Sequence, residues 1–311
     1  MCLTQQSKEF LQNLEAQRTP PVESLPPAQG RRLFAALNRW HGERIEIEKV
    51  EDFLFPGNLK ARLYRSTDSS GSGREKMQPA IVYFHGGGWV LGNLDTHDVL
   101  CRNLAQKSQC TVIAIDYHLS PEAKYPLAFD QCYSAVSHTI DHASSLKINP
   151  DRVAVAGDSA GGNLAAAVAL RARDSSGPDI DLQILIYPVL NPDFQQESYV
   201  KYSEGFGLTR GRMQWFWNQY LGSTMPDCYA APGLSGNLKG LPTTHLITAE
   251  YDVLRSEGEL YAKRLIDAGV PTTLKRYHGN LHGFVHFAGI FDDGHTAMTE
   301  IARYCGAHLY R

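Results

Sequence analysis

A five-residue motif, Gly157-Asp158-Ser159-Ala160-Gly161, holds the serine whose surroundings best suit it to covalent chemistry. The motif lies between an apolar run, 153–156, and an alanine-rich stretch, 163–173, which predicts a sharp turn from a strand into a helix. Small residues are needed on both sides of such a turn because a Cβ there would strike the neighbouring strand or helix. The turn leaves the hydroxyl of Ser159 standing clear at the edge of a sheet, and Ser159 is therefore a candidate nucleophile.

A second motif, His85-Gly86-Gly87-Gly88, follows directly on an apolar run that reads as a strand. Three glycines at a strand end let the backbone approach a ligand closely with its N–H groups turned inward. We expect the amides of Gly87 and Gly88, with that of Ala160, to form an oxyanion hole for the negative oxygen of a tetrahedral intermediate. Gly86 is the less favoured donor.

A serine hydroxyl needs a base to take its proton, and that base needs an acceptor that holds its ring. Asp252 follows the apolar run 244–249, and His282 follows the run 272–277. Both side chains are therefore expected on loops at the carboxyl edge of the sheet, beside Ser159. We predict that His282 is the base and that Asp252 orients it.

Three other histidines and one glutamate compete for these two roles. His278 lies close to the strand end, whereas His286 and His295 are expected within or beyond the following helix, where a lone histidine is usually structural. Glu250 falls at a strand end and is expected to hydrogen-bond loop backbone.

Other conspicuous residues near the motifs are predicted to be structural. The side chain of Asp158 is expected to point away from the Ser159 hydroxyl and to fix a loop, while Asp116 and Glu122 are expected to hold a turn. The aromatic group in 215–220 is expected to line or close an apolar pocket. No phosphate-binding loop or metal-ligand spacing is found, so we expect no cofactor and no metal.

Apolar runs and helical patterns alternate along most of the chain, which predicts a doubly wound, mostly parallel sheet. An antiparallel hairpin with strands at 45–53 and 59–65 is expected at one edge, turning at Pro56-Gly57-Asn58, and a serine- and glycine-rich loop follows at 66–78. The remaining strands are predicted at 80–84, 111–115, 153–156, 183–187, 244–249 and 272–277, and helices at 95–109, 127–142, 163–173, 256–268 and 296–309.

Two segments break this alternation, 1–40 with its proline-rich interruption and 191–229 with its aromatic group. Both are predicted to be helical insertions that cover the sheet. We therefore expect a single domain over 1–311, with a cap formed by about 1–40 and about 191–229.

The composition excludes several classes of function. Of the 311 residues, 43% are hydrophobic and 20% charged, which suits a packed soluble protein, and a net charge of −3 draws in neither nucleic acid nor an anionic membrane. The first residues lack the uninterrupted apolar run of a secretory signal, and no later run is long enough to span a bilayer. Six scattered cysteines suit a reducing compartment, so we predict a cytoplasmic protein. A homodimer is compatible with the sequence.

The motifs, taken together and in this order, resemble those of the bacterial hormone-sensitive-lipase-like carboxylesterases, in the branch whose elbow reads Gly-Asp-Ser-Ala-Gly-Gly. The resemblance runs from roughly residue 45 to the C-terminus. It rests on His85-Gly86-Gly87-Gly88-Trp89, Gly157-Asp158-Ser159-Ala160-Gly161-Gly162, Asp252-Val253-Leu254-Arg255 and His282-Gly283-Phe284, with support from the segment 116–122 and from Tyr187-Pro188. His118 and Ser120 depart from the usual arginine and alanine, outside the expected site.

This resemblance implies an α/β-hydrolase fold with a helical cap, and an esterase that acts on short- to medium-chain acyl esters without a cofactor. Three other functions remain open on the same scaffold. They are a protein that binds a small ligand without catalysis, an amidase or peptidase with the same triad, and a lipase that acts at interfaces.

Overall fold

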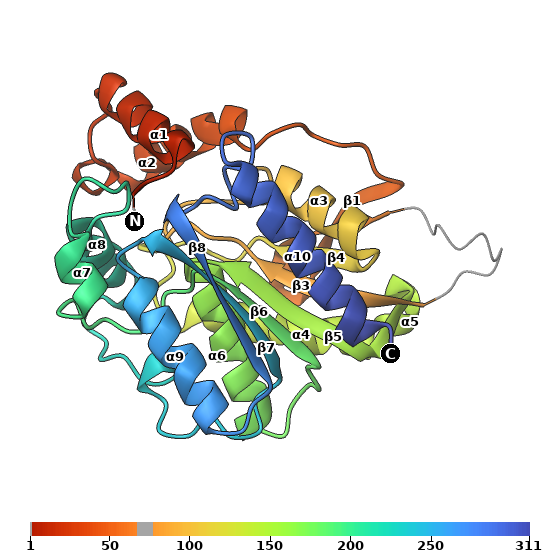
Figure 1. Ribbon diagram of the computed structural model, residues 1–311. Coiled ribbons are helices and arrows are strands. Elements are labelled where there is room, and N and C mark those ends of the chain that lie inside the picture. The colour runs from red at the N-terminus through yellow and green to blue at the C-terminus, as the bar shows by residue number, and fades with distance from the viewer. Residues whose placement is uncertain (1, 67–76) are drawn as a thin grey trace.

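Eight strands form one sheet in the order β1-β2-β4-β3-β5-β6-β7-β8 in the computed structural model, which describes residues 2–66 and 77–311 (Figure 1). Strand β2 is antiparallel to both of its neighbours, and every other pairing is parallel. The strands are β1 (Lys49–Phe55), β2 (Leu59–Arg65), β3 (Gln78–Phe84), β4 (Thr111–Ile115), β5 (Ile148–Asp158), β6 (Leu182–Ile186), β7 (Thr243–Tyr251) and β8 (Thr272–Leu281). The predicted doubly wound, mostly parallel sheet with an edge hairpin is confirmed.

Several strands extend beyond their predicted ends because polar residues there still pair with a neighbouring strand. β5 begins at Ile148, which pairs with Gln78, and it continues to Asp158 beside Ile186 of β6. β8 reaches Leu281, which pairs with Tyr251. The predicted loop at 66–78 falls largely outside the described residues.

The larger helices cover both faces of the sheet (Figure 1). On one face lie α3 (Asp98–Ser108) and α10 (Asp292–Leu309), and on the other lie α4 (Leu127–Asp141), α6 (Ala160–Asp174) and α9 (Arg255–Asp267), with the short α5 (Ala143–Leu146) beside β5. α3 begins later than predicted because Asn93 and Thr96 close a turn before it through reciprocal hydrogen bonds of 2.9 Å.

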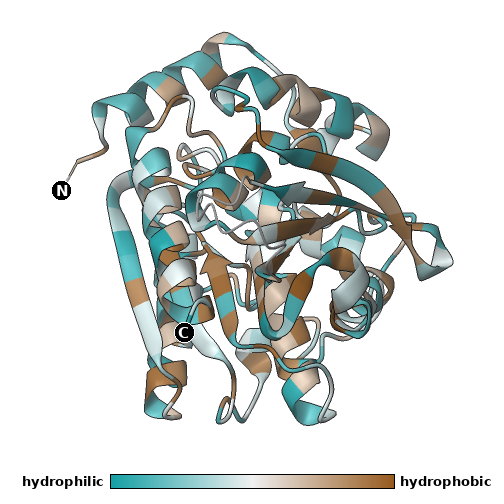
Figure 2. Cartoon of the chain, turned by 90° about the vertical axis from the view of Figure 1, so that its right-hand side faces the viewer, coloured by the Kyte–Doolittle hydropathy of each residue, from teal (hydrophilic) through white to brown (hydrophobic). Residues whose placement is uncertain are grey.

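Each face of the sheet has its own hydrophobic core, as the two-residue period of a strand requires. In β3, Val82 and Phe84 face the core beneath α4 and α6, while Ile81 and Tyr83 face the core beneath α3 and α10. Figure 2 shows hydrophobic colour along the central strands and hydrophilic bands on the outer helices. These two cores hold the strand ends that carry the predicted site.

The two segments that break the alternation lie together near the carboxyl ends of the strands (Figure 1). They contain α1 (Gln5–Ala16), the single turn η1 (Val22–Ser24), α2 (Pro27–Ala35) and η2 (Ala36–Trp40) at the N-terminus, and α7 (Glu197–Lys201) and α8 (Arg210–Leu221) in the insertion. Arg212 joins them through an ion pair of 2.9 Å with Glu23, and Arg31 donates to the carbonyls of Val90 and Ser120. That they act as a cap stays a prediction. In the part of the chain that the structure describes, no helix is long and apolar enough to cross a membrane.

Candidate active site

Ser159 occupies a strained turn between β5 and α6, with φ 56° and ψ −117°. A Cβ on Gly161 would lie 1.9 Å from the carbonyl oxygen of Phe84, and one on Gly157 would lie 2.3 Å from the backbone of Gly161. No side chain fits in either place. The turn is held from the other side by the Ser159 amide, which donates to the carbonyl of Ile186 at 2.9 Å.

The three residues predicted to act with one another lie within hydrogen-bond distance. Nε2 of His282 is 3.0 Å from Oγ of Ser159, and Nδ1 of His282 is 2.7 Å from Oδ2 of Asp252. An ionised carboxylate only accepts, so Nδ1 carries the hydrogen and Nε2 presents its lone pair to the serine hydroxyl. Asp252 is itself held, because its Oδ1 accepts from the amide of Leu254 at 2.9 Å.

The competing residues lie elsewhere. His278 is exposed and sits 3.3 Å from Glu250, whose carboxylate also accepts from the amide of Gly279 at 2.8 Å, in the structural role expected of it. His295 is exposed on α10. His286 was expected within or beyond the following helix, and this is wrong: it is buried in the turns between β8 and α10, which begins at Asp292.

The amides of the glycine loop after β3 have two different environments. Gly86 donates its N–H to Oδ1 of Asp158 at 2.9 Å, so this amide is already used. Gly87 and Gly88 have φ of 114° and 61°, and within residues 2–66 and 77–311 their amides have no hydrogen-bond acceptor. Ala160 begins α6, so its N–H also lacks an acceptor within the helix.

Asp158 ties the glycine loop to the elbow. Its Oδ1 accepts from Gly86 and from the hydroxyl of Tyr83 at 2.8 Å, and it lies 3.2 Å from Nε2 of His97. Burial by itself would raise the pKa of Asp158, but His97 and the Tyr83 hydroxyl together lower that pKa below its usual value. Asp158 thus has the loop-fixing contacts predicted for it.

The aromatic residues of α8 pack against the glycine loop. Trp89 stacks on Tyr220 with ring centroids 4.2 Å apart and contacts Trp217 at 4.7 Å. A Cβ on Gly88 would lie 2.2 Å from the ring of Phe216. The sequence singled out this aromatic group for a pocket wall, but its contact with the glycine loop was not foreseen.

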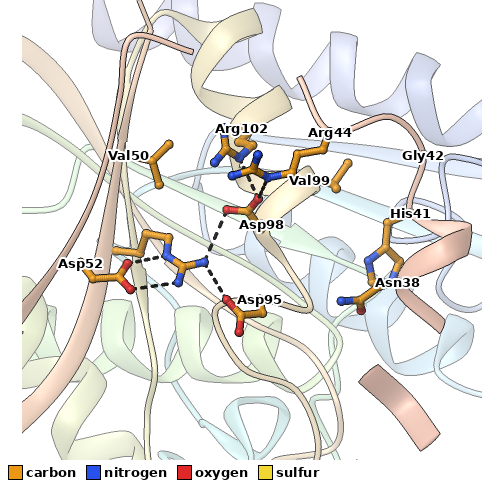
Figure 3. A pocket seen from close by; sticks show the side chains of 11 residues that line it. Asn38, His41, Gly42, Arg44, Val50, Asp52, Asp95, Asp98, Val99 and Arg102 are labelled. Carbon is orange, nitrogen blue, oxygen red and sulfur yellow. Dashed lines mark hydrogen bonds and ion pairs between the residues drawn. The ribbon is translucent and has the colours of Figure 1, made fainter. Parts of the chain in front are cut away.

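Two neighbouring cavities lie apart from the serine. One of about 810 Å³ is lined by His41 and by charged residues of β1, β2 and α3, and one of about 550 Å³ lies beside Arg31, Thr96 and Tyr117. Figure 3 shows the first of them. Neither is lined by Ser159 or His282.

Known proteins match both the sequence and the fold. A family described as having the alpha/beta hydrolase fold matches residues 81–286. The carboxylic ester hydrolase LipN of Mycobacterium tuberculosis is 40% identical over 282 residues, 87% of this chain and 73% of that protein. The solved ester-hydrolase EH1AB1 from the metagenome of Lake Arreo is 36% identical with a TM-score of 0.94, covering 99% of this chain and 100% of that one. A hyperthermophilic esterase from Pyrobaculum calidifontis is 38% identical with a TM-score of 0.91, covering 99% of each chain.

The chain therefore belongs to this α/β-hydrolase family. Within it, the chain is one of the hormone-sensitive-lipase-like carboxylesterases, and it is a serine carboxylic ester hydrolase. The fold and the family predicted from the motifs are both confirmed.

Proposed function

We propose that Ser159, His282 and Asp252 form the catalytic triad of this ester hydrolase, with Ser159 as the nucleophile. The observation that carries the proposal is the unbroken chain of contacts from Ser159 Oγ to His282 Nε2 at 3.0 Å and from His282 Nδ1 to Asp252 Oδ2 at 2.7 Å. His282 takes the serine proton as Oγ attacks the ester carbonyl, and Asp252 stabilises the imidazolium that forms. The distances and the order of the three groups support this proposal.

The amides of Gly87, Gly88 and Ala160 receive the negative charge that develops on the carbonyl oxygen. Gly86 is left out because its N–H donates to Asp158. The tetrahedral intermediate then collapses, the bond to the alcohol oxygen breaks, and His282 returns its proton to the departing alcohol. Water, deprotonated by the same histidine, attacks the acyl-enzyme, and the carboxylic acid leaves as Ser159 regains its proton.

We propose acyl esters of short to medium chain length as the substrates. Phe216 packs on Gly88, and Trp217 and Tyr220 pack on Trp89, so α8 occupies the space over the glycine loop. Arg31 ties the N-terminal segment to the carbonyls of Val90 and Ser120, and Arg212 ties the insertion to Glu23 of the N-terminal segment. A cap held in this way favours a compact acyl group over a long chain.

Hydrolysis of p-nitrophenyl butyrate tests the assignment of the nucleophile. We expect Ser159→Ala to lose at least about 10⁴-fold in kcat, since the oxyanion hole alone retains only a small part of the rate. Ser134→Ala, which changes an exposed serine on α4, is the matched control and should keep the wild-type rate. Near-normal turnover by Ser159→Ala, with an unchanged circular dichroism spectrum, would refute the triad.

Two further measurements separate this function from its alternatives. A fluorophosphonate should label the wild type and not Ser159→Ala; an unlabelled wild type would favour a binding protein without an activated serine. Rates on p-nitrophenyl butyrate, on the palmitate ester and on the butyryl anilide then compare esterase, lipase and amidase. Preference for palmitate with a rise in rate above the micelle concentration would replace the esterase proposal by a lipase.

We also propose a cytoplasmic location. All six cysteines are unpaired thiols, and Cys101, Cys110, Cys132 and Cys305 are buried in the cores, which suits a reducing compartment. Fractionation of the native host tests this location, and sedimentation equilibrium tests the homodimer that the sequence allows.

A further inference from the structure

A second group of histidines and an aspartate lies behind the elbow, and the triad does not use it. His97, Asp158 and His286 are at most 4% exposed, and one ligand atom of each lies within 4.8 Å of the others. His97 precedes α3, Asp158 ends β5, and His286 lies between β8 and α10. Three segments far apart in the chain thus bring two imidazoles and a carboxylate to one buried point.

The hydrogen bonds of Thr96 decide which nitrogen of His97 is free. The Thr96 hydroxyl donates to the carbonyl of Asn93 at 2.9 Å, so its oxygen acts as an acceptor toward Nδ1 of His97 at 3.0 Å. With the hydrogen of the neutral ring on Nδ1, Nε2 of His97 has the lone pair that a cation would bind. This Nε2 lies 3.2 Å from Oδ1 of Asp158, and the Gly86 amide points at both atoms, 3.3 Å from Nε2 and 2.9 Å from Oδ1.

That separation matches a metal site. Two ligands at about 2.0–2.1 Å from a tetrahedral Zn²⁺ are about 3.3 Å apart. A metal-bound histidine is also normally held through its other nitrogen, which is what Thr96 does for His97. A cation between Nε2 and Oδ1 would bridge two atoms that already lie 3.2 Å apart.

His286 supplies an independent observation. Among the described residues, neither of its ring nitrogens has a hydrogen-bond partner, although the side chain is only 4% exposed. Buried polar atoms without partners are rare and costly. The His286 ring lies 4.2 Å from the ring of His97 and 4.0 Å from that of His41, measured between centroids. A ligand that accepts a nitrogen lone pair at this position would give His286 its missing partner.

We propose that Nε2 of His97, the carboxylate of Asp158 and a ring nitrogen of His286 form a binding site for a divalent transition-metal ion of the Zn²⁺ or Co²⁺ type. Two imidazoles and one carboxylate suit these ions, whereas Ca²⁺ and Mg²⁺ prefer oxygen ligands alone. The three residues leave a coordination position for water. This site is separate from the catalytic triad and does not depend on the function proposed for it.

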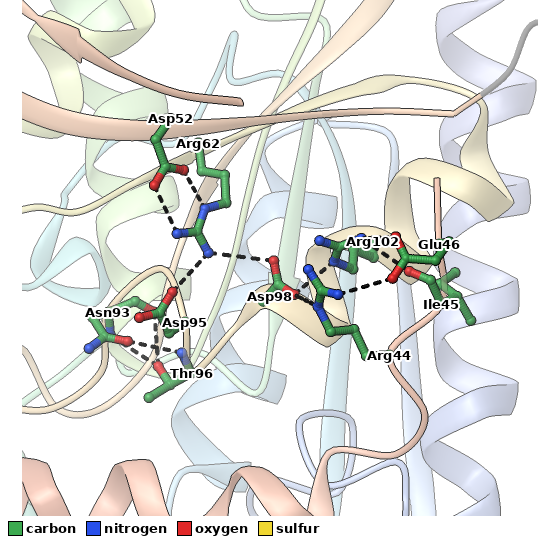
Figure 4. Close-up of polar contacts among 10 residues, drawn as sticks. All are labelled: Arg44, Ile45, Glu46, Asp52, Arg62, Asn93, Asp95, Thr96, Asp98 and Arg102. Atoms are coloured by element: carbon green, nitrogen blue, oxygen red, sulfur yellow. Dashed lines mark hydrogen bonds and ion pairs between the residues drawn. The ribbon is translucent and has the colours of Figure 1, made fainter. Parts of the chain in front are cut away.

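The cavity of about 810 Å³ lies one side chain away from the site, because His41 lines the cavity and packs on His286. Figure 3 shows His41 and Asn38 at one side of the cavity, away from its charged residues. Those residues are already paired: Figure 4 shows Arg62 between Asp52, Asp95 and Asp98, with Arg44 and Arg102 also on Asp98. Within the cavity, His41 is therefore the residue that lies next to the proposed site.

The metal would link parts of the chain that the hydrogen bonds of Asp158 already connect. The carboxylate that would bind it also accepts from Gly86 and Tyr83, so occupancy acts on the glycine loop. The three ligands come from separate segments and do not meet in the unfolded chain, so binding stabilises the folded state.

Isothermal titration with Zn²⁺, after treatment of the protein with a chelator, tests the site. We expect one Zn²⁺ per chain, a rise in Tm with Zn²⁺, and at least tenfold weaker binding by His286→Gln and by His97→Gln. The matched control is His142→Gln, because His138 and His142 stack at 3.7 Å near the end of α4 and offer a competing surface pair. Circular dichroism checks the fold of each variant.

Crystals of the wild type soaked in Co²⁺ give a test that needs no variant. An anomalous peak between His97, Asp158 and His286 supports the proposal. A peak at His138 and His142 alone, or Zn²⁺ binding that His142→Gln abolishes and His286→Gln leaves intact, overturns it. Absence of any Zn²⁺ binding by the wild type also overturns it and assigns a proton to the contact between His97 and Asp158.

Discussion

Two groups of histidine and aspartate flank the elbow at Ser159, and they differ in which of their polar atoms have hydrogen-bond partners. In the first, His282 has one partner on each ring nitrogen, Ser159 at 3.0 Å and Asp252 at 2.7 Å. In the second, around Asp158, both ring nitrogens of His286 lack partners within the described residues.

This is the difference we expect between the proposed triad, which must move a proton, and the proposed cation site. A triad works only if each atom has a defined donor or acceptor, since the direction of proton transfer depends on it. In the second group the Gly86 amide points at Nε2 of His97 at 3.3 Å, whereas His286 has two ring nitrogens without partners among the described residues, one of which has a lone pair in the neutral ring. A buried lone pair without a donor is the feature that a bound cation would satisfy in our proposal.

The largest effect should come from breaking the first group. We expect His282→Gln to lower kcat for p-nitrophenyl butyrate by about 10⁴-fold or more, because no other group then takes the serine proton. His278→Gln changes an exposed histidine four residues away and serves as the control. Equal loss of activity in both variants would contradict the assignment of the base.

Removing the carboxylate of Asp158 from the second group should lower both the stability of the protein and its rate of ester hydrolysis. Asp158→Ala removes the acceptor of the Gly86 amide and of the Tyr83 hydroxyl, both buried. We expect the free energy of unfolding to fall by about 3 kcal/mol, and kcat to fall by about 10²-fold as the glycine loop loses its anchor. Urea unfolding and single-turnover rates measure the two effects. A stable, fully active Asp158→Ala protein would show that the two groups are independent.

The packing of α8 on the glycine loop is open to a smaller test. A Cβ on Gly88 would meet the ring of Phe216 at 2.2 Å, and the φ of 61° adds strain. We expect Gly88→Ala to destabilise the protein by about 1–3 kcal/mol, as measured by the urea midpoint. Adding Phe216→Ala should recover part of that stability relative to Phe216→Ala alone. If the stability does not recover, the whole loss of stability comes from the strained backbone at residue 88.

The smallest effect should appear in the pH dependence of stability. Burial and then the charge of His97 lower the pKa of His41 from 6.5 to about 4, and burial lowers that of His85 to about 3. These rings stay neutral in the folded state while the unfolded chain takes up protons. Their contribution is therefore complete above about pH 6.5 and is lost progressively as the pH falls toward 4.

Thermal unfolding between pH 7 and pH 4 measures this loss. We expect His41→Asn to flatten the fall of Tm over that range relative to the wild type. His295→Asn, at an exposed position on α10, should leave the slope unchanged. An unaltered slope in His41→Asn would show that other groups control acid unfolding.

The residues of the proposed site that the sequence could predict are those marked by local sequence patterns. Ser159 could be identified because Gly157 and Gly161 have no room for a Cβ, and such a need is visible as a motif. Asp252 and His282 could be identified because parallel strands end at one edge of the sheet, so residues just after two strands meet there.

Other assignments needed contacts that no spacing reveals. Gly86 is the less favoured oxyanion donor because its amide donates to Asp158, 72 residues away. His286 was misplaced because nothing in the sequence marks the buried turns that separate β8 from α10. Helix boundaries depend on packing and capping as well as on the apolar period.

By itself, the sequence determined the sheet, the order of the proposed catalytic residues and the family, because strand periodicity and glycine motifs depend on only a few consecutive residues. Only the tertiary structure decided that α8 packs on the glycine loop and that His97, Asp158 and His286 meet. These contacts join side chains from separate segments, and their chemistry depends on burial and distance. Both arise only when the two faces of the sheet are packed.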